Sequence, residues 1–525
     1  MMNQRRPHAP RARNSFALPA RLLMLLLLAA PALASGAPVI YYTDLAVGPN
    51  TGGESNLGAF VTVFGRGFGM TRGNGSVTIG GGQAGSYRSW ADTKIVIQLG
   101  PQAMSGNISV TDAAAATSNG VPFTVGAGRV REATTATMAS VVSSVQSGDV
   151  IYMRGGTYSS RYGTTTWGDR ALVLGPWAAN VAFVGYPGES VTIGAVNLAD
   201  QGGVANGVTL ANFSIRSSFD CIYGGHFWQN EESGATNTRA INLDCQANYG
   251  SANTMTGLIA LGGDGWRVLG SYFHDTGSVA VNNNHAIYIQ VGADDVEVAW
   301  NRFERIKLGH VIQTHTDGTA RTYENIRVHD NEISATSPDD CRGINFGNVS
   351  SSSYGVVYNN VLRNVGQDFS AIAVYAGTWK IFNNTLVGIK ASPGIVWVQG
   401  SGGHAEVRNN VIVSNGQSPY ITAFNGGSMS QFTISNNLYF GNGGAPSQDT
   451  APVNSDPLFV DLAIGNLRLG LSSPAVDTGT NAVQTVVLLD HDGNSRPQRG
   501  GFDIGAYEAT GVSLPRVQNV RIQVN

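Results

Sequence analysis

The chain is poor in cysteine, in charged residues and in long apolar runs, and each shortage excludes a class of protein. Three cysteines, Cys221, Cys245 and Cys341, are too few for a disulfide-framework fold or a cysteine-based zinc cluster. Charged residues make up 13% of the chain and the formal net charge is -3, which gives no electrostatic basis for binding nucleic acid. The apolar run 22–30 is too short to span a bilayer.

Glycine is abundant, with 68 residues, and 42% of the 525 residues are hydrophobic. Many glycines beside Asn, Ser and Thr favour a β protein with tight turns, and the hydrophobic content argues against disorder. A chain of this length exceeds one ordinary core, so we expect several domains or a repeat architecture.

The N-terminus has the features of an export signal. Five arginines between positions 5 and 21 precede the apolar run 22–30, and Ala32-Leu33-Ala34 is a small-x-small cleavage site. We therefore expect residues 1–34 to be a cleaved signal peptide and the mature protein to be secreted or periplasmic. A retained membrane anchor is the alternative.

Residues 38–125 contain short alternating strands separated by glycine turns, a pattern typical of a small β-sandwich. Three motifs occur in order: Gly65-Arg66-Gly67-Phe68-Gly69, Trp90-Ala91-Asp92-Thr93-Lys94-Ile95 and Ser118-Asn119-Gly120-Val121-Pro122-Phe123. With them the segment resembles an IPT/TIG immunoglobulin-like module. The resemblance implies a spacer or an accessory near carbohydrate, and so support instead of chemistry.

Asparagine-led segments recur further along the chain, at Asn301, Asn331, Asn360, Asn384, Asn410 and Asn437, with separations of 30, 29, 24, 26 and 27 residues. This period predicts one coil of a parallel β-solenoid per repeat. Asparagine suits such a position because it tolerates left-handed turn geometry and can pass amide hydrogen bonds from coil to coil. We expect the solenoid over residues 126–511, a tail at 512–525, and a helix over 136–147 that covers the open first edge.

A second strand repeats in step with the first, and its isoleucines, Ile287, Ile312, Ile344, Ile372 and Ile395, are expected to point inward. Aligning these isoleucines predicts which side chains are neighbours on successive coils. Tyr288 should lie beside Gln313 and Asn345, and Gln290 beside His315, while His285, His310 and Arg342 should form a column at the strand edge. His285 and His310 share the parity of the inward isoleucines, so a structural role is the alternative for both.

The C-terminal segments Asp456-Pro457-Leu458-Phe459 and Asp503-Ile504-Gly505-Ala506-Tyr507-Glu508 resemble the closing region of bacterial right-handed parallel β-helix proteins, and should seal the last coil. As a whole the chain is similar to secreted proteins of this type, polysaccharide lyases among them. The resemblance implies an all-β protein, a right-handed parallel β-helix preceded by a small immunoglobulin-like β-sandwich. It also implies an enzyme that acts on an acidic polysaccharide, with lyases that cleave by β-elimination prominent among such enzymes. We expect the protein to be a monomer.

Elimination at a uronic acid needs a cation for the carboxylate, a base for the C5 proton and an acid for the leaving oxygen. Lys307 or Arg342 is the candidate cation, His310 or His315 the base and Tyr288 the acid, with His285 in the same column. The candidate substrate-binding residues are Arg302, Arg305, Gln290, Gln313, Asn345 and Tyr375.

Several alternatives stay open. Ca²⁺ could replace the cation, with Asp317, Asp339 and Asp340 as the nearest carboxylates. A glycoside hydrolase would need two carboxylates, and the central outward columns contain neither Asp nor Glu. A non-catalytic glycan-binding protein or adhesin would show repeated small polar residues on every coil, whereas here the titratable side chains gather between His285 and Arg342. Cys221 and Cys245, 24 residues apart, would stack as a disulfide one coil apart, and unpaired thiols are the alternative.

Overall fold

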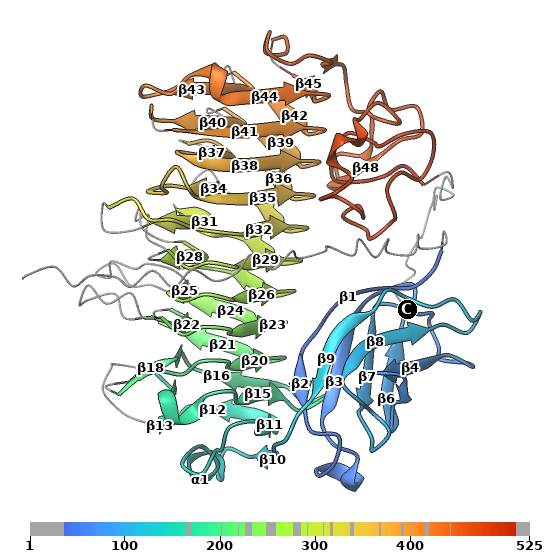
Figure 1. Cartoon of the computed structure of the whole chain (residues 1–525), viewed down its shortest axis with the longest axis vertical. Coiled ribbons are helices and arrows are strands. Elements are labelled where there is room, and N and C mark those ends of the chain that lie inside the picture. The colour runs from blue at the N-terminus through green and yellow to red at the C-terminus, as the bar shows by residue number, and fades with distance from the viewer. Residues whose placement is uncertain are drawn as a thin grey trace, which may run out of the picture.

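The computed structural model describes residues 36–163, 170–200, 202–218, 220–225, 234–247, 259–276, 285–290, 292–307, 309–315, 319–336, 341–366, 369–389, 393–400, 402–414, 419–441 and 443–510. A long parallel β-solenoid forms the body of the molecule, and a β-sandwich lies along its side (Figure 1). Residues 456–510, here called the C-terminal lobe, pack beside the later coils. The all-β prediction is therefore confirmed.

The sandwich has two sheets that enclose a hydrophobic core. One contains β1 (Val39–Thr43), β3 (Phe60–Arg66), β7 (Lys94–Gln98) and β6 (Ser86–Ala91), and the other β2 (Val47–Gly48), β9 (Val121–Val125), β8 (Gly106–Thr111), β4 (Ser76–Ile79) and β5 (Gly82–Gln83). Alternate residues such as Val77, Ile79, Ile108 and Val110 are fully buried. The strand alternation in the sequence thus predicts the two layers correctly.

The solenoid has three parallel sheets, named I, II and III in the order in which each coil passes through them. Sheet I contains β10 (Val130–Ala133), β11 (Val150–Met153), β15 (Ala182–Gly185), β20 (Thr209–Ala211), β23 (Arg239–Ile241), β26 (Arg267–Leu269), β29 (Glu297–Ala299), β32 (Ile326–His329), β35 (Tyr354–Tyr358), β38 (Gly377–Phe382), β41 (Gly403–Arg408) and β44 (Phe432–Ser435). Sheet II contains β12 (Gly156–Tyr158), β16 (Val191–Ile193), β21 (Ser214–Ser217), β24 (Asp244–Ala247), β27 (Tyr272–His274), β30 (Arg302–Glu304), β33 (Glu332–Ser334), β36 (Val361–Arg363), β39 (Thr385–Ile389), β42 (Val411–Ser414), β45 (Leu438–Phe440) and β46 (Val453–Asn454).

Sheet III contains β13 (Tyr162–Gly163), β14 (Leu172–Val173), β17 (Val196–Asn197), β22 (Ile222–Tyr223), β25 (Ile259–Leu261), β28 (Ile287–Gln290), β31 (His310–His315), β34 (Arg342–Phe346), β37 (Ile372–Val374), β40 (Ile395–Val398) and β43 (Ile421–Phe424). Two hairpins, β18 (Ala199–Asp200) with β19 (Gly203–Val204) and β47 (Phe459–Asp461) with β48 (Asn466–Leu469), and the short helices α1 (Met138–Val142), η1 (Glu54–Asn56), η2 (Pro176–Ala178), η3 (Met429–Gln431) and η4 (Asn481–Val483) complete the described elements. Within these ranges no helix has the length and hydropathy needed to cross a membrane.

The asparagine repeat forms a buried hydrogen-bond ladder at the corner between sheets I and II. From Asn301 to Asn410, each side-chain amide donates to the Oδ1 of the next asparagine at 2.9 to 3.0 Å. The ladder ends at Asp449, whose Oδ2 accepts from Asn437 at 3.0 Å. The predicted hydrogen bonding is thus confirmed, but the left-handed residue is the one before each ladder position, for example Asn383 with φ 52°.

The segments expected to cover the two ends of the solenoid differ in where they pack. The helix expected over 136–147 is present as the shorter α1, whose Met138 and Val142 are fully buried in the solenoid core. The prediction that the C-terminal segment seals the last coil is wrong, because the segment packs against the side of the solenoid. Its Leu467 and Ile504 pack sideways on sheet II against apolar residues such as Val411. The outward face of sheet II is apolar on these coils and therefore needs a cover.

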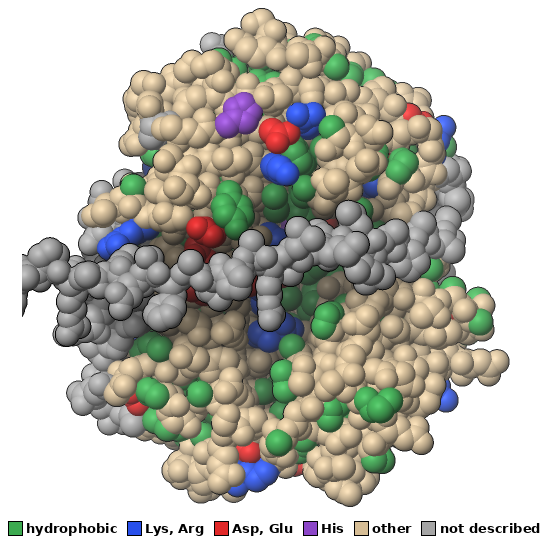
Figure 2. Space-filling view, viewed as in Figure 1, with side chains coloured by type: hydrophobic (Ala, Val, Ile, Leu, Met, Phe, Trp, Pro, Cys, Tyr) green, Lys and Arg blue, Asp and Glu red, His purple; other side chains and the backbone are tan. Residues whose placement is uncertain are grey.

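The sandwich and the C-terminal lobe together cover sheet I. Sandwich residues share a hydrophobic cluster with six successive strands, from β11 to β29. The lobe packs on later strands, where Val483 and Phe502 contact Phe382. The two covers also meet, because the Tyr41 hydroxyl donates to the backbone oxygen of Asp492 at 2.9 Å. Figure 2 shows a hollow between the solenoid and these covers, in which charged and apolar side chains gather.

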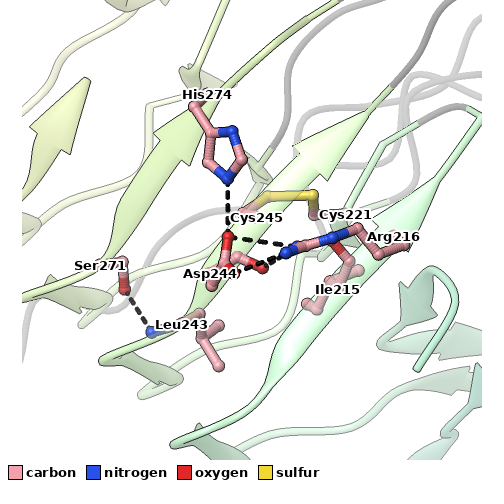
Figure 3. Close-up of a disulfide and its surroundings, with 8 residues drawn as sticks. All are labelled: Ile215, Arg216, Cys221, Leu243, Asp244, Cys245, Ser271 and His274. Atoms are coloured by element: carbon pink, nitrogen blue, oxygen red, sulfur yellow. Dashed lines mark hydrogen bonds and ion pairs between the residues drawn. A yellow bond between two sulfur atoms is a disulfide. The ribbon is translucent and has the colours of Figure 1, made fainter. Parts of the chain in front are cut away.

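A disulfide joins Cys221 to Cys245, with 6.2 Å between their Cα atoms (Figure 3). The predicted pairing is confirmed, but the reasoning from stacking is wrong. Cys245 lies in β24 and pairs in register with Ile215, whereas Cys221 lies at the corner before β22 of the preceding coil. The bond therefore links sheet II of one coil to the corner of its neighbour. Both sulfur atoms are buried, as is the third cysteine, Cys341.

Candidate functional site

The predicted column of His285, His310 and Arg342 is present on sheet III. β31 and β34 pair His310 with Arg342, and β28 and β31 pair Ile287 with Ile312, which sets His285 directly before His310. Tyr288, Gln313 and Asn345 are also neighbours in register, as are Gln290 and His315. Adjacent strands lie about 4.8 Å apart, so the described side chains of these columns, from which that of His315 is left out, occupy one continuous surface.

The parity argument that turned His285 and His310 inward is wrong. Ala286 and Val311, which follow them, are buried in the interior cluster together with the next isoleucines. Two successive residues can face inward because each strand begins at a corner of the coil, where strict alternation breaks. The histidines are therefore on the outward side, in line with Tyr288.

Ring contacts fix the geometry of this group. The rings of His285 and Tyr288 are stacked with centroids 5.3 Å apart and an angle of 8°, and the rings of His285 and His310 are 6.3 Å apart. Nδ1 of His285 lies 3.1 Å from the backbone oxygen of His310. A carbonyl oxygen only accepts, so Nδ1 donates the hydrogen, and in the neutral ring Nε2 is the basic nitrogen.

Phe369 stands over the other end of the column. Its ring packs edge-on against His310 with centroids 5.2 Å apart, and the Arg342 guanidinium lies 5.9 Å from its centre. Burial raises the pKa of Tyr375, which follows the next strand, and the positive charge of Arg342 opposes that shift. An arginine, two histidines and a tyrosine therefore share one partly apolar surface.

Four polar side chains on this surface have buried atoms without a hydrogen-bond partner among the described residues. They are Nε2 of Gln290, Oε1 of Gln313, Oδ1 of Asn345 and Oγ of Ser370. Each residue is at most 7% exposed, and they lie on four successive coils. Leaving such a group unsatisfied costs about 1–3 kcal/mol, so these four buried atoms are the least well satisfied polar groups of this surface.

Asp220 is a further member of the column, which the sequence reasoning missed. It precedes Cys221 and the inward Ile222, as His285 precedes Ala286 and Ile287, and this shared spacing is the signal that could have found it. Its carboxylate pairs with Arg170 at 2.9 Å. Burial raises the pKa of Asp220, and Arg170 opposes the shift. Asp220 therefore adds a carboxylate two coils before His285, outside the coils that the expectation covered.

The remaining predicted residues are not all brought to this surface. Arg302 and Arg305 lie on and just after β30 of sheet II, where they form ion pairs with Glu304 and Asp275. Lys307 follows them at the corner before sheet III, and its backbone N–H donates to Thr276 at 2.7 Å. The side chain of His315, and all of Asp317, Asp339 and Asp340, lie outside the described residues. The calcium prediction rests on those aspartates, and the residues that are described contain no group of three or more ligands for a metal.

Two other histidines are held in carboxylate networks. His274 bonds Asp244 and Asp275, and His329 bonds Glu297 and Asp330, at 2.6 to 3.1 Å. Figure 3 shows the first of these contacts beside the disulfide. Both ring nitrogens of each histidine are occupied, which agrees with the structural role that fully satisfied hydrogen bonding indicates.

Comparison with known proteins identifies the N-terminal module. Residues 45–125 match the IPT/TIG domain family. No curated protein matches the chain. Solved structures with similarity include pectate lyase Pel9A, with 13% identity over 70% of this chain and 90% of that chain and a TM-score of 0.34. They also include the PL6 family alginate lyase AlyGC, with 15% identity over 63% of this chain and 54% of that chain and a TM-score of 0.32. A third is the family 28 exopolygalacturonase of Yersinia enterocolitica, with 11% identity over 80% of this chain and 88% of that chain and a TM-score of 0.33. The chain is thus an IPT/TIG domain at residues 45–125 followed by a parallel β-solenoid.

Proposed function

We propose that this protein is an exported enzyme that cleaves a uronic-acid-containing polysaccharide by β-elimination on the outward face of sheet III. The observation that carries the proposal is the column of His285, His310 and Arg342 beside Tyr288. A base, a cation and a hydroxyl acid on neighbouring coils are the groups that elimination requires. The unmet amide and hydroxyl atoms beside them suit the hydroxyl groups of a sugar chain.

His285 is the best-placed base. Its Nδ1–H is held by the His310 backbone oxygen, so Nε2 carries the lone pair in the neutral ring. Arg342 would pair with the substrate carboxylate and withdraw charge from it, which acidifies the neighbouring C5–H. His310, between them, orients His285 through its backbone and lines the same surface.

The reaction then balances without a further reagent. His285 takes the C5 proton, the electron pair forms the C4–C5 double bond, and the C4–O bond breaks. The departing oxygen takes a proton from Tyr288, whose ring is stacked on His285. The products are one new reducing end and one unsaturated uronate.

The test is incubation of the purified protein with a panel of uronic-acid polymers while the ultraviolet absorbance of the unsaturated product is followed. We expect His285→Gln to lower kcat by about 10²- to 10⁴-fold, the usual contribution of a general base. His404→Gln is the matched control, since His404 lies on sheet I and bonds Thr433 at the surface. Equal activity of the two variants would reject His285 as the base.

Hydrolysis is the second candidate, and Asp220 is the observation that favours it. A hydrolase needs two carboxylates. Among the described residues of the column, Asp220 supplies one of them. Release of reducing ends from a polymer, with no rise in the ultraviolet absorbance of an unsaturated product, would establish hydrolysis and reject elimination. Binding with neither signal would make the protein a glycan-binding or adhesin module.

A further inference from the structure

One outward column of sheet III changes character along the solenoid. In register it contains Asn197, Tyr223, the backbone of residue 260, Tyr288, Gln313 and Asn345. On the next two coils the same column contains Ala373 and Val396. The polar and aromatic part from Tyr223 to Asn345 spans four steps, or about 19 Å.

The apolar end of this column is covered by aromatic rings. Ala373 and Val396 are fully buried although they point away from the solenoid core, because Phe369, Tyr375 and Phe424 pack over them. The rings of Phe369 and Phe424 meet edge-on with centroids 6.3 Å apart. Of these partly exposed rings, that of Phe369 lies directly beside His310 and Arg342.

The opposite end carries groups that suit a sugar. Tyr223 is partly exposed, and the Arg170 guanidinium lies 5.2 Å from the centre of its ring. Asp220 pairs with the same arginine. An aromatic face beside an arginine and a carboxylate offers stacking for the apolar face of a sugar and hydrogen bonds for its hydroxyls.

We infer that the sugar chain lies along the solenoid axis from Tyr223 to Arg342 and that Phe369 ends its path. This inference rests on the proposed function and adds a direction to it. The reacting column then lies at the closed end of the path, with binding positions on the N-terminal side. The protein therefore removes short fragments from a chain end, and Phe369 determines their length.

The test compares the full chain with two variants on size-graded oligosaccharides prepared from pectate and alginate. Wild type should release one narrow class of short products from the earliest time points. Phe369→Ala should release longer fragments than wild type, because Tyr375 and Phe424 then end the path farther along the solenoid. Tyr223→Ala should raise KM about tenfold for long oligosaccharides and leave the shortest cleaved one unchanged. Tyr354→Ala, an aromatic 44% exposed on sheet I, is the matched control and should behave as wild type.

A broad ladder from wild type, or an unchanged product pattern in Phe369→Ala with an unchanged melting temperature, would overturn the inference. Failure of the proposed function gives a different result, namely no cleavage of any polymer by wild type. In that case calorimetric titration with the same oligosaccharides tests the path directly. Affinity that increases with length and drops in Tyr223→Ala supports it, and affinity that is absent or unaffected by Tyr223→Ala overturns it.

Discussion

The asparagine ladder should be one of the most sensitive structural features of this protein to substitution. Asn384 is fully buried in the middle of the ladder. Its Nδ2 donates to Val357 O and to Asn410 Oδ1, each at 3.0 Å, and its Oδ1 accepts from the backbone and side-chain nitrogens of Asn360, also at 3.0 Å. Asn384→Ala removes all four bonds and leaves a buried backbone N–H unsatisfied.

The expected loss follows from these contacts. An ordinary buried hydrogen bond contributes about 1 kcal/mol and an unsatisfied buried donor costs about 1–3 kcal/mol. The four bonds and the one unsatisfied donor together give a decrease of about 5–7 kcal/mol in the free energy of unfolding, which is exceptional for a single substitution. Urea unfolding followed by tryptophan fluorescence measures it, with buried Trp379 on the same coil as the reporter. Asn466→Ala, at a partly exposed position of β48, is the control, and a loss at Asn384 no larger than at Asn466 would refute the reasoning.

Four further predictions concern stability. Although burial lowers the pKa of His329, hydrogen bonds to Asp330 and Glu297 raise it to about 9. The stability that protonated His329 contributes is therefore complete below pH 6.5 and should be lost as the pH rises through 9. Thermal melts measure this, and a melting temperature that does not change over that range would contradict it. Glu297 should show the opposite pH dependence of stability. Burial raises its pKa, but the hydrogen bond and charge of His329 outweigh burial and lower the pKa to about 2. The stability that ionised Glu297 contributes should therefore be lost as the pH falls from 4.5 toward 2. Reducing the disulfide should lower the melting temperature of the solenoid, and an unchanged melt would show that the link is dispensable. Tyr152→Phe should cost about 1 kcal/mol, measured by urea unfolding, because the hydroxyl donates to Phe60 O of the sandwich at 2.7 Å and is buried; no change would mean that the two parts dock without it.

The register of sheet III was predictable because one inward isoleucine per coil aligns all outward neighbours at once. That alignment alone places Tyr288 beside Gln313, and the structure agrees. The side of His285 was not predictable from alternation, since a corner residue does not obey the period of a strand. Asp220 was missed because it lies two coils before His285 and a long stretch of sequence separates the two residues, so the predicted column began too late.

Packing between distant segments was the least predictable part. Nothing in the local pattern of the C-terminal lobe says whether it covers an end or a side of the solenoid. The decisive signal is the outward apolar residues of sheet II, such as Val387 and Val411, which form a surface only after the coils are stacked. Likewise, the position of the disulfide in the coils could not be predicted without the coil length at Cys245. That length is 30 residues, whereas the two cysteines are 24 residues apart.

The two covers on sheet I affect how the molecule comes apart. A bare stack of repeats can fray from either end, because each coil contacts only its neighbours. Here the sandwich packs against the coils from β11 to β29, and the lobe packs against later coils and contacts the sandwich. Fraying of a terminal coil must also break these contacts with the sandwich or the lobe. The protein should therefore resist proteases until the solenoid unfolds in a single cooperative transition.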